Sequence, residues 1–148
     1  MSRDLHGTAT GRLRTAGQRY TGRRRRLVEL LADAGHPLTI PDILATGSGL
    51  KQSSVYRNLA DLEQAGVVRR VPTDEGFGGY ELAEDLIGHH HHLVCTRCGK
   101  IRDVAVPPGV EGTLDRALDR IAKRAGFAHV SHRLDLVGLC AECAAETR

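Results

Sequence analysis

Two pairs of cysteines bracket most of the second half of the chain. Cys95 and Cys98 form one pair, Cys140 and Cys143 the other, and 41 residues separate them. A pair with this spacing grips an ion from one tight turn, and two pairs complete the four-sulfur shell that zinc favours. Redox chemistry would need only one pair, and disulfides are disfavoured in a cytosolic protein. The spacing therefore predicts a structural zinc site.

Four consecutive histidines, at positions 89–92, lie just before the first cysteine pair. Side chains alternate between the two faces of an extended chain, so His90 and His92 would face one way and His89 and His91 the other. Imidazole nitrogen is a ligand for zinc, iron and nickel near neutral pH. The run predicts two separate metal sites on opposite faces of one strand. The alternative is a solvated polar linker, which the neighbouring cysteines disfavour.

Each histidine pair needs further ligands from elsewhere in the sequence. The even-numbered pair has candidates in Glu81 and His36, which would meet it at the boundary between the two halves of the chain. The odd-numbered pair has candidates in Glu111, at the start of a predicted helix, and His132, on a predicted strand. Carboxylates and imidazoles together suit several divalent metals.

The composition excludes several classes of protein. The 148 residues carry a formal net charge of +3 and are 41% hydrophobic, which excludes a disordered chain. No apolar run approaches the roughly 18 residues that cross a bilayer, and the first residues lack the apolar stretch of a signal peptide. We therefore expect a cytoplasmic protein with no membrane partner. Residues 1–70 hold twelve basic and six acidic side chains, which favours a polyanionic partner for that half.

The first half has the pattern of a helix-turn-helix followed by a hairpin. Apolar spacing predicts a helix from about residue 21 to Gly35, a short helix after Thr39, and a third helix at about 53–65. Strand-like residues at 67–82, with a turn at 72–79, are typical of the wing of a winged helix.

The second half predicts a small α/β unit. Three strands are expected near residues 93–94, 100–106 and 133–139, with an amphipathic helix ending at Gly126 between the last two. The chain is thus predicted to be α+β. Its expected divisions are a winged helix-turn-helix domain at 1–83, of which 1–18 form an arm or first helix, a hinge at 84–88, and a metal-binding domain at 89–148.

The order of these features resembles the ferric uptake regulator family of metal-dependent bacterial repressors, over nearly the whole chain from about Arg19. The segments that carry the similarity are Ser54-Val55-Tyr56-Arg57, Tyr80-Glu81-Leu82, His89 to Cys95, Cys98-Gly99-Lys100, Val130-Ser131-His132, and Gly138-Leu139-Cys140 with Cys143. The resemblance implies an N-terminal winged helix and a small C-terminal α/β dimerisation domain. It also implies a homodimer that binds palindromic operators in double-stranded DNA when a regulatory metal is bound.

Carried over by position, the resemblance implies three metal sites. The cysteines match the family's structural zinc site, and Glu81 with the even-numbered histidines matches three ligands of a regulatory site at the hinge. The fourth hinge ligand is usually a histidine at the position of Pro37, for which His36 is the nearest substitute. The second regulatory site is matched by His89, His91, Glu111 and His132.

The third predicted helix is the candidate DNA reader. Helical spacing turns Ser53, Tyr56 and Arg57 away from the apolar face and towards a major groove. The arginines near the first predicted helix would contact phosphates, although a solvated helix face is the alternative. The candidate DNA-binding residues are Arg19, Arg23, Arg24, Ser53, Ser54, Tyr56 and Arg57.

These features predict a metal-responsive transcriptional repressor of metal-homeostasis genes, which is not an enzyme. We expect structural Zn²⁺ and a regulatory Fe²⁺ or Zn²⁺, with peroxide or nickel sensing in the same family as the alternative. A zinc-dependent hydrolase is a different class, but neither an HExxH segment nor an HxE before a PCxxC occurs. A metal-storage protein would use the histidines but leave the winged helix without a role.

Overall fold

The N-terminal half folds as four helices followed by a hairpin. The computed structural model describes residues 4–73 and 76–147. The elements of this half are α1 (Leu5–Thr15), α2 (Gly22–Ala34), α3 (Ile40–Ala45), α4 (Gln52–Gln64), β1 (Val68–Thr73) and β2 (Gly76–Leu82). Val55, Leu59 and Leu62 of α4 are fully buried in the common core, as their spacing predicts. The predicted helix-turn-helix is therefore confirmed.

Local capping explains where the helices begin and end. Thr39 and Asp42 form a reciprocal capping box at the start of α3, with a proline in the first turn. α2 ends at Gly35, whose φ of 65° is the left-handed conformation that glycine adopts without strain. These signals are local, so the sequence alone locates the helix ends.

The hairpin is the predicted wing and is anchored to the helices. β1 and β2 are antiparallel, and Arg69 pairs with Glu81 across them. An isolated bridge between Leu38 and Tyr80 joins the hairpin to the segment before α3. Residues 74 and 75 of the predicted wing turn lie outside the described residues, as do 1–3 and 148 of the predicted domains.

The predicted hinge, 84–88, contains one helical turn, α5 (Glu84–Ile87). Arg12 of α1 donates to the carbonyl of Gly66 (2.6 Å) and pairs with the carboxylate of Asp85. The segment expected at 1–18 to be an arm or a first helix thus contains a helix, and that helix contacts the hinge.

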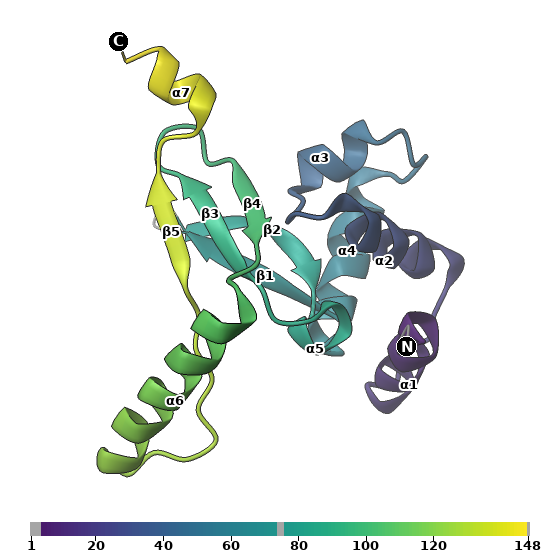
Figure 1. The fold of residues 1–148 in the computed structure, drawn as a ribbon. Coiled ribbons are helices and arrows are strands. Elements are labelled where there is room, and N and C mark those ends of the chain that lie inside the picture. The colour runs from purple at the N-terminus through teal and green to yellow at the C-terminus, as the bar shows by residue number, and fades with distance from the viewer. Residues whose placement is uncertain (1–3, 74–75, 148) are drawn as a thin grey trace.

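The C-terminal half contains a three-stranded sheet with a long helix beside it. Its elements are β3 (His91–Cys95), β4 (Ile101–Val104), α6 (Pro108–Arg124), β5 (Asp135–Gly138) and the unpredicted α7 (Ala141–Ala145). The strand order is β4-β3-β5, with β3 antiparallel to β4 and parallel to β5. Figure 1 shows the hairpin between this sheet and the N-terminal helices, and α6 extending away from both.

The apolar faces of this half are largely uncovered in a single chain. α6 is strongly amphipathic, yet Val110 and Ile121 on its apolar face are 57% and 61% exposed. On β5, an edge strand of the sheet, Leu136 and Val137 are 46% and 59% exposed. An exposed apolar surface of this kind marks an interaction site.

The architecture is α+β, as predicted. Among the described residues, no helix combines the length and hydropathy needed to span a membrane. The exact boundaries at 83 and 88 stay a prediction, because contacts between the two halves continue across them.

Candidate metal centres

The four cysteines lie together at one end of the sheet. Their sulfur atoms are all within 4.8 Å of one another, and none forms a disulfide. The Sγ atoms of Cys98 and Cys140 are 3.8 Å apart. Sulfurs each about 2.3 Å from one zinc ion are about 3.8 Å apart in a tetrahedron, so this spacing fits zinc.

Two local structures position this cysteine cluster. Cys95 ends β3 and Cys98 lies in the turn that follows it. The other pair lies at the start of α7, where Cys140 N–H donates to Cys95 Sγ (3.3 Å). Backbone N–H groups of Cys140, Cys98 and Arg97 lower the pKa of Cys95 to about 6. Burial and the neighbouring cysteines raise the pKa of Cys143 to about 12. A metal ion would favour the thiolate form of all four sulfurs.

The odd-numbered histidines form a second cluster, which we call the helix cluster: His89, His91, Glu111 and His132. Glu111 lies in the first turn of α6, and its Oε1 is 3.0 Å from His89 Nε2 and 2.7 Å from His132 Nε2. Its Oε2 is 2.8 Å from His91 Nε2. All four predicted residues are therefore brought together by the fold.

The even-numbered histidines form a third cluster, which we call the hinge cluster: Glu81, His90, His92 and Asp103. Glu81 is on β2 of the wing, and its Oε2 lies 3.1 Å from the Nε2 atoms of both His90 and His92. Asp103 Oδ1, on β4, lies 3.9 Å and 3.8 Å from the same two nitrogens. The cluster thus joins the N-terminal hairpin to the C-terminal sheet.

The fourth member of the hinge cluster differs from the predicted one. His36 is exposed, its Nδ1 lies 2.9 Å from the carbonyl oxygen of Pro37, and it is absent from the cluster. Asp103 takes that position because it is the cross-strand partner of His92 in the β3–β4 register. Facing residues on paired strands are close in space, a signal that needs the register and not only the sequence.

A buried polar atom supports metal binding at the hinge cluster. Among the described side chains, His91 Nδ1 and Asp103 Oδ1 are the buried nitrogen or oxygen atoms that have no hydrogen-bond partner. A buried polar atom without a partner is costly, and bonding to an ion would remove that cost. Asp103 Oδ1 faces the hinge cluster, so an ion bound there would satisfy it, whereas His91 presents Nε2 and not Nδ1 to the helix cluster. The nitrogen and carboxylate donors of both clusters suit a divalent cation.

Outer hydrogen bonds orient the histidine rings. His90 Nδ1 donates to the carbonyl of Gly88 (3.0 Å), and His92 Nδ1 donates to Asp135 Oδ1 (3.2 Å). In the helix cluster, His132 Nδ1 is 3.1 Å from Asp115 Oδ1. Such bonds fix the ring and leave Nε2 directed at a metal, as in characterised metal sites.

Glu81 is poised as an ionised ligand. Burial alone would raise its pKa, but hydrogen bonding to His92 and the charge of Arg69 outweigh burial and lower the pKa to about 2. The carboxylate is therefore ionised near neutral pH, in the form that binds cations.

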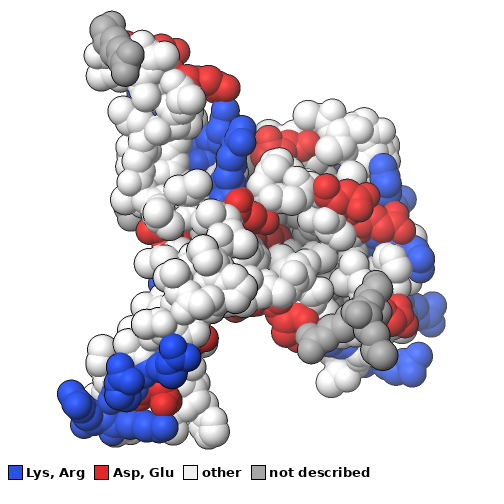
Figure 2. Space-filling view, viewed as in Figure 1, with Lys and Arg blue, Asp and Glu red and all other residues white. Residues whose placement is uncertain are grey.

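The candidate DNA-binding residues have different surroundings. Arg19, Arg23, Ser53, Tyr56 and Arg57 are exposed, and Ser54 is half-buried with its Oγ accepting from Asn58. Figure 2 shows Lys and Arg side chains along the outer edge of the N-terminal helices.

Arg24 departs from the prediction of a phosphate contact. It is 7% exposed, its guanidinium pairs with Asp61, and it donates to Asn58 Oδ1 and Gln18 Oε1 at 3.1 Å. Position 24 faces the core, because it lies three residues before Leu27 on α2. The charge of Arg24 is paired inside the protein with Asp61 of α4, and this ion pair holds α2 against α4.

A model of the ferric uptake regulator family matches residues 15–137 of this chain. The chain belongs to the ferric uptake regulator family. The ferric uptake regulation protein of Neisseria meningitidis serogroup A is 31% identical over 139 residues, which cover 90% of this chain and 92% of that protein. The peroxide operon regulator of Bacillus subtilis is 29% identical over 136 residues and covers 88% of each chain.

Solved structures of the family share the fold. The ferric uptake regulator of Helicobacter pylori, whose structure reveals three functional metal binding sites, aligns with a TM-score of 0.70 at 27% identity and covers 97% of this chain and 95% of its own. The predicted fold class, an N-terminal DNA-binding domain and a C-terminal dimerisation domain, is confirmed. This member of the ferric uptake regulator family is a metal-responsive transcriptional regulator and not an enzyme, which removes the hydrolase and storage alternatives.

Proposed function

We propose that this regulator is a homodimeric repressor that binds palindromic double-stranded DNA when its hinge cluster holds Fe²⁺ or Zn²⁺. Zinc in the cysteine cluster would serve a structural role, and the protein would act in the cytoplasm on metal-homeostasis genes. The ligands of the hinge cluster are nitrogen and oxygen atoms, which suit either regulatory metal.

One observation carries the proposal: the hinge cluster takes its ligands from both halves of the chain. Glu81 belongs to the wing next to the DNA reader. His92 and Asp103 belong to the C-terminal sheet, and His90 lies just before its strand β3. A divalent ion supplies bonds to all of these ligands at once. These ligands then hold the reader at one angle to the sheet, and the population shifts towards the DNA-binding arrangement.

A second copy of the chain is the proposed cover for the uncovered apolar surface on α6 and β5. The apolar character of this surface favours a homodimer, and a two-fold dimer presents two readers to the half-sites of a palindrome. The proposed DNA contacts are Arg19, Arg23, Ser53, Ser54, Tyr56 and Arg57. We leave Arg24 out because its guanidinium is buried and paired with Asp61.

Peroxide or nickel sensing is the second candidate. The similarity to the Bacillus subtilis peroxide operon regulator favours the former. A DNA-binding titration of the iron-loaded protein before and after hydrogen peroxide distinguishes peroxide sensing from iron sensing. A peroxide sensor loses operator binding irreversibly, whereas an iron sensor regains operator binding when Fe²⁺ is restored.

The decisive test is His90→Ala in a gel-shift titration with palindromic duplex. We expect the variant to lose metal-dependent binding, because the ring that faces Glu81 Oε2 is gone. The zinc content of the cysteine cluster and the circular dichroism spectrum should be those of the parent. His129→Ala is the matched control, since this exposed histidine belongs to none of the three clusters. Metal dependence that survives in His90→Ala would refute the proposal.

A further inference from the structure

Arg69 of β1 holds one oxygen of Glu81 and leaves the other free. Its Nε and Nη2 lie 2.7 Å and 2.6 Å from Glu81 Oε1. Glu81 Oε2 is left facing the two histidines of the hinge cluster. The planar guanidinium fork therefore fixes which carboxylate oxygen is presented as a ligand.

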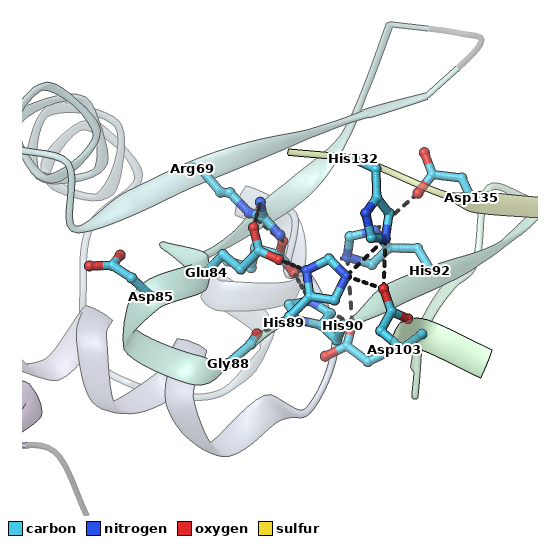
Figure 3. A network of polar contacts seen from close by, with 12 residues as sticks. Arg69, Glu84, Asp85, Gly88, His89, His90, His92, Asp103, His132 and Asp135 are labelled. Atoms are coloured by element: carbon cyan, nitrogen blue, oxygen red, sulfur yellow. Dashed lines mark hydrogen bonds and ion pairs between the residues drawn. The ribbon is translucent and has the colours of Figure 1, made fainter. Parts of the chain in front are cut away.

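The same guanidinium reaches towards the helix cluster through Glu84. Arg69 Nη1 is 3.7 Å from Glu84 Oε2, and Glu84 Oε1 contacts His89 Nδ1. The opposite ring nitrogen of His89 is the one that faces Glu111 in the helix cluster. Figure 3 shows Glu84 between Arg69 and His89.

The four residues Glu81, Arg69, Glu84 and His89 thus form a continuous chain between the two clusters. Glu81 is 3% exposed, and Arg69 and Glu84 are each only about a third exposed or less, so the charges are partly shielded from solvent. Glu84 starts α5, and the next residue, Asp85, is held by Arg12. This row of four interacting residues is therefore anchored on the N-terminal helices as well as on the wing.

We propose that Arg69 and Glu84 couple the two histidine clusters, so that a metal ion in either cluster raises the affinity of the other. The inference rests on the proposed function, in which both clusters hold metal. An imidazole that ligates through Nε2 becomes a stronger donor at Nδ1, so a loaded helix cluster fixes Glu84 more firmly. Glu84 then orders Arg69, and Arg69 orders Glu81 in its ligating orientation. The first metal ion to bind orders Glu84, Arg69 and Glu81. The second ion then binds without that loss of conformational entropy, which gives positive coupling.

Titration of the full-length protein with Co²⁺, with zinc left in the cysteine cluster, tests the coupling. His132→Ala disables the helix cluster while leaving the hinge cluster intact, and His92→Ala does the reverse. We expect each variant to lower the affinity of the remaining cluster by about five-fold or more, and by the same factor in both directions, because coupling is reciprocal. The readouts are Co²⁺ absorption and calorimetric stoichiometry.

Glu84→Gln isolates the link from the ligands. The amide oxygen can still accept from His89, but the charge that attracts Arg69 is lost. In the Glu84→Gln background, we expect His132→Ala to leave hinge affinity unchanged. The matched control is Glu63→Gln, which removes the partner of Arg70, the neighbour of Arg69 on the same strand (Arg70 Nε to Glu63 Oε2, 3.1 Å). Coupling should persist in this control.

The outcomes separate the two proposals. If both clusters bind Co²⁺ but His132→Ala has no effect on hinge affinity, or the same effect with and without Glu84→Gln, the coupling is overturned and the proposed function stands. If Co²⁺ binding is insensitive to both His132→Ala and His92→Ala, the clusters are not the metal sites, and both proposals fail.

Discussion

At the scale of single residues, Asp103 completes the hinge cluster. Its Oδ1 is buried without a hydrogen-bond partner and faces two imidazole nitrogens at less than 4 Å. Burial raises the pKa of Asp103, and the nearby histidines oppose that rise only in part. A bound cation would stabilise the ionised carboxylate, so we assign Asp103 the ligand role that sequence position suggested for His36.

Asp103→Asn tests this assignment. The amide is nearly the same size but carries no charge, so we expect the affinity of the hinge cluster for Co²⁺ to fall by at least about ten-fold, the lower limit for losing even a supporting group. His36→Ala is the comparison and should bind Co²⁺ as the parent does. The opposite ranking of the two variants in calorimetric titrations would restore His36 as the ligand.

At the scale of elements, the wing contacts the sheet at a glycine. A Cβ built on Gly78 of β2 would lie 2.3 Å from Ile101 Cδ1 of β4 and 2.6 Å from Thr73 Cγ2 of β1. Two side chains from different strands therefore crowd this position, and glycine lets the wing approach β4. The same approach brings Glu81, three residues further along β2, to the hinge histidines.

Gly78→Val should push the wing away from β4. We expect weaker Co²⁺ binding at the hinge cluster, while zinc remains in the cysteine cluster, which takes no ligand from the wing. Ile101→Ala in the same chain removes the larger obstacle and should recover part of the lost affinity. Calorimetry on the single and double variants measures both effects, and an affinity unaltered by Gly78→Val would show that the contact does not position Glu81.

At the scale of the whole molecule, a single chain leaves its C-terminal half incompletely covered. The helices and hairpin of the N-terminal half enclose a core of buried side chains. No residue of α6, by contrast, is buried, although its apolar residues lie on one face. The proposed second copy of the chain would cover this exposed apolar face with a surface of the same kind.

Ile121→Glu should convert the proposed dimer to a monomer, because a charge would be buried on the apolar face of α6, near its C-terminal end. The expected readout is a halved mass in light scattering after size-exclusion chromatography. Arg116→Glu is the control, because it introduces the same side chain on the polar face of α6. This variant should keep the mass of a dimer. A dimer that persists in Ile121→Glu would exclude α6 from the interface.

The sequence by itself determined the features that depend on local geometry. The spacing of the cysteines, the alternation of the histidines on two faces, and the helix caps at Thr39 and Gly35 follow from turn and strand periodicity. Only the tertiary structure decided which distant groups meet. A cross-strand register brought Asp103 into the hinge cluster and left His36 outside it. Helix packing made Arg24 an internal ion-pair partner, and Arg69 and Glu84 came to lie between the two histidine clusters. Such encounters join segments far apart in the chain, and their geometry is set by packing that no local pattern encodes.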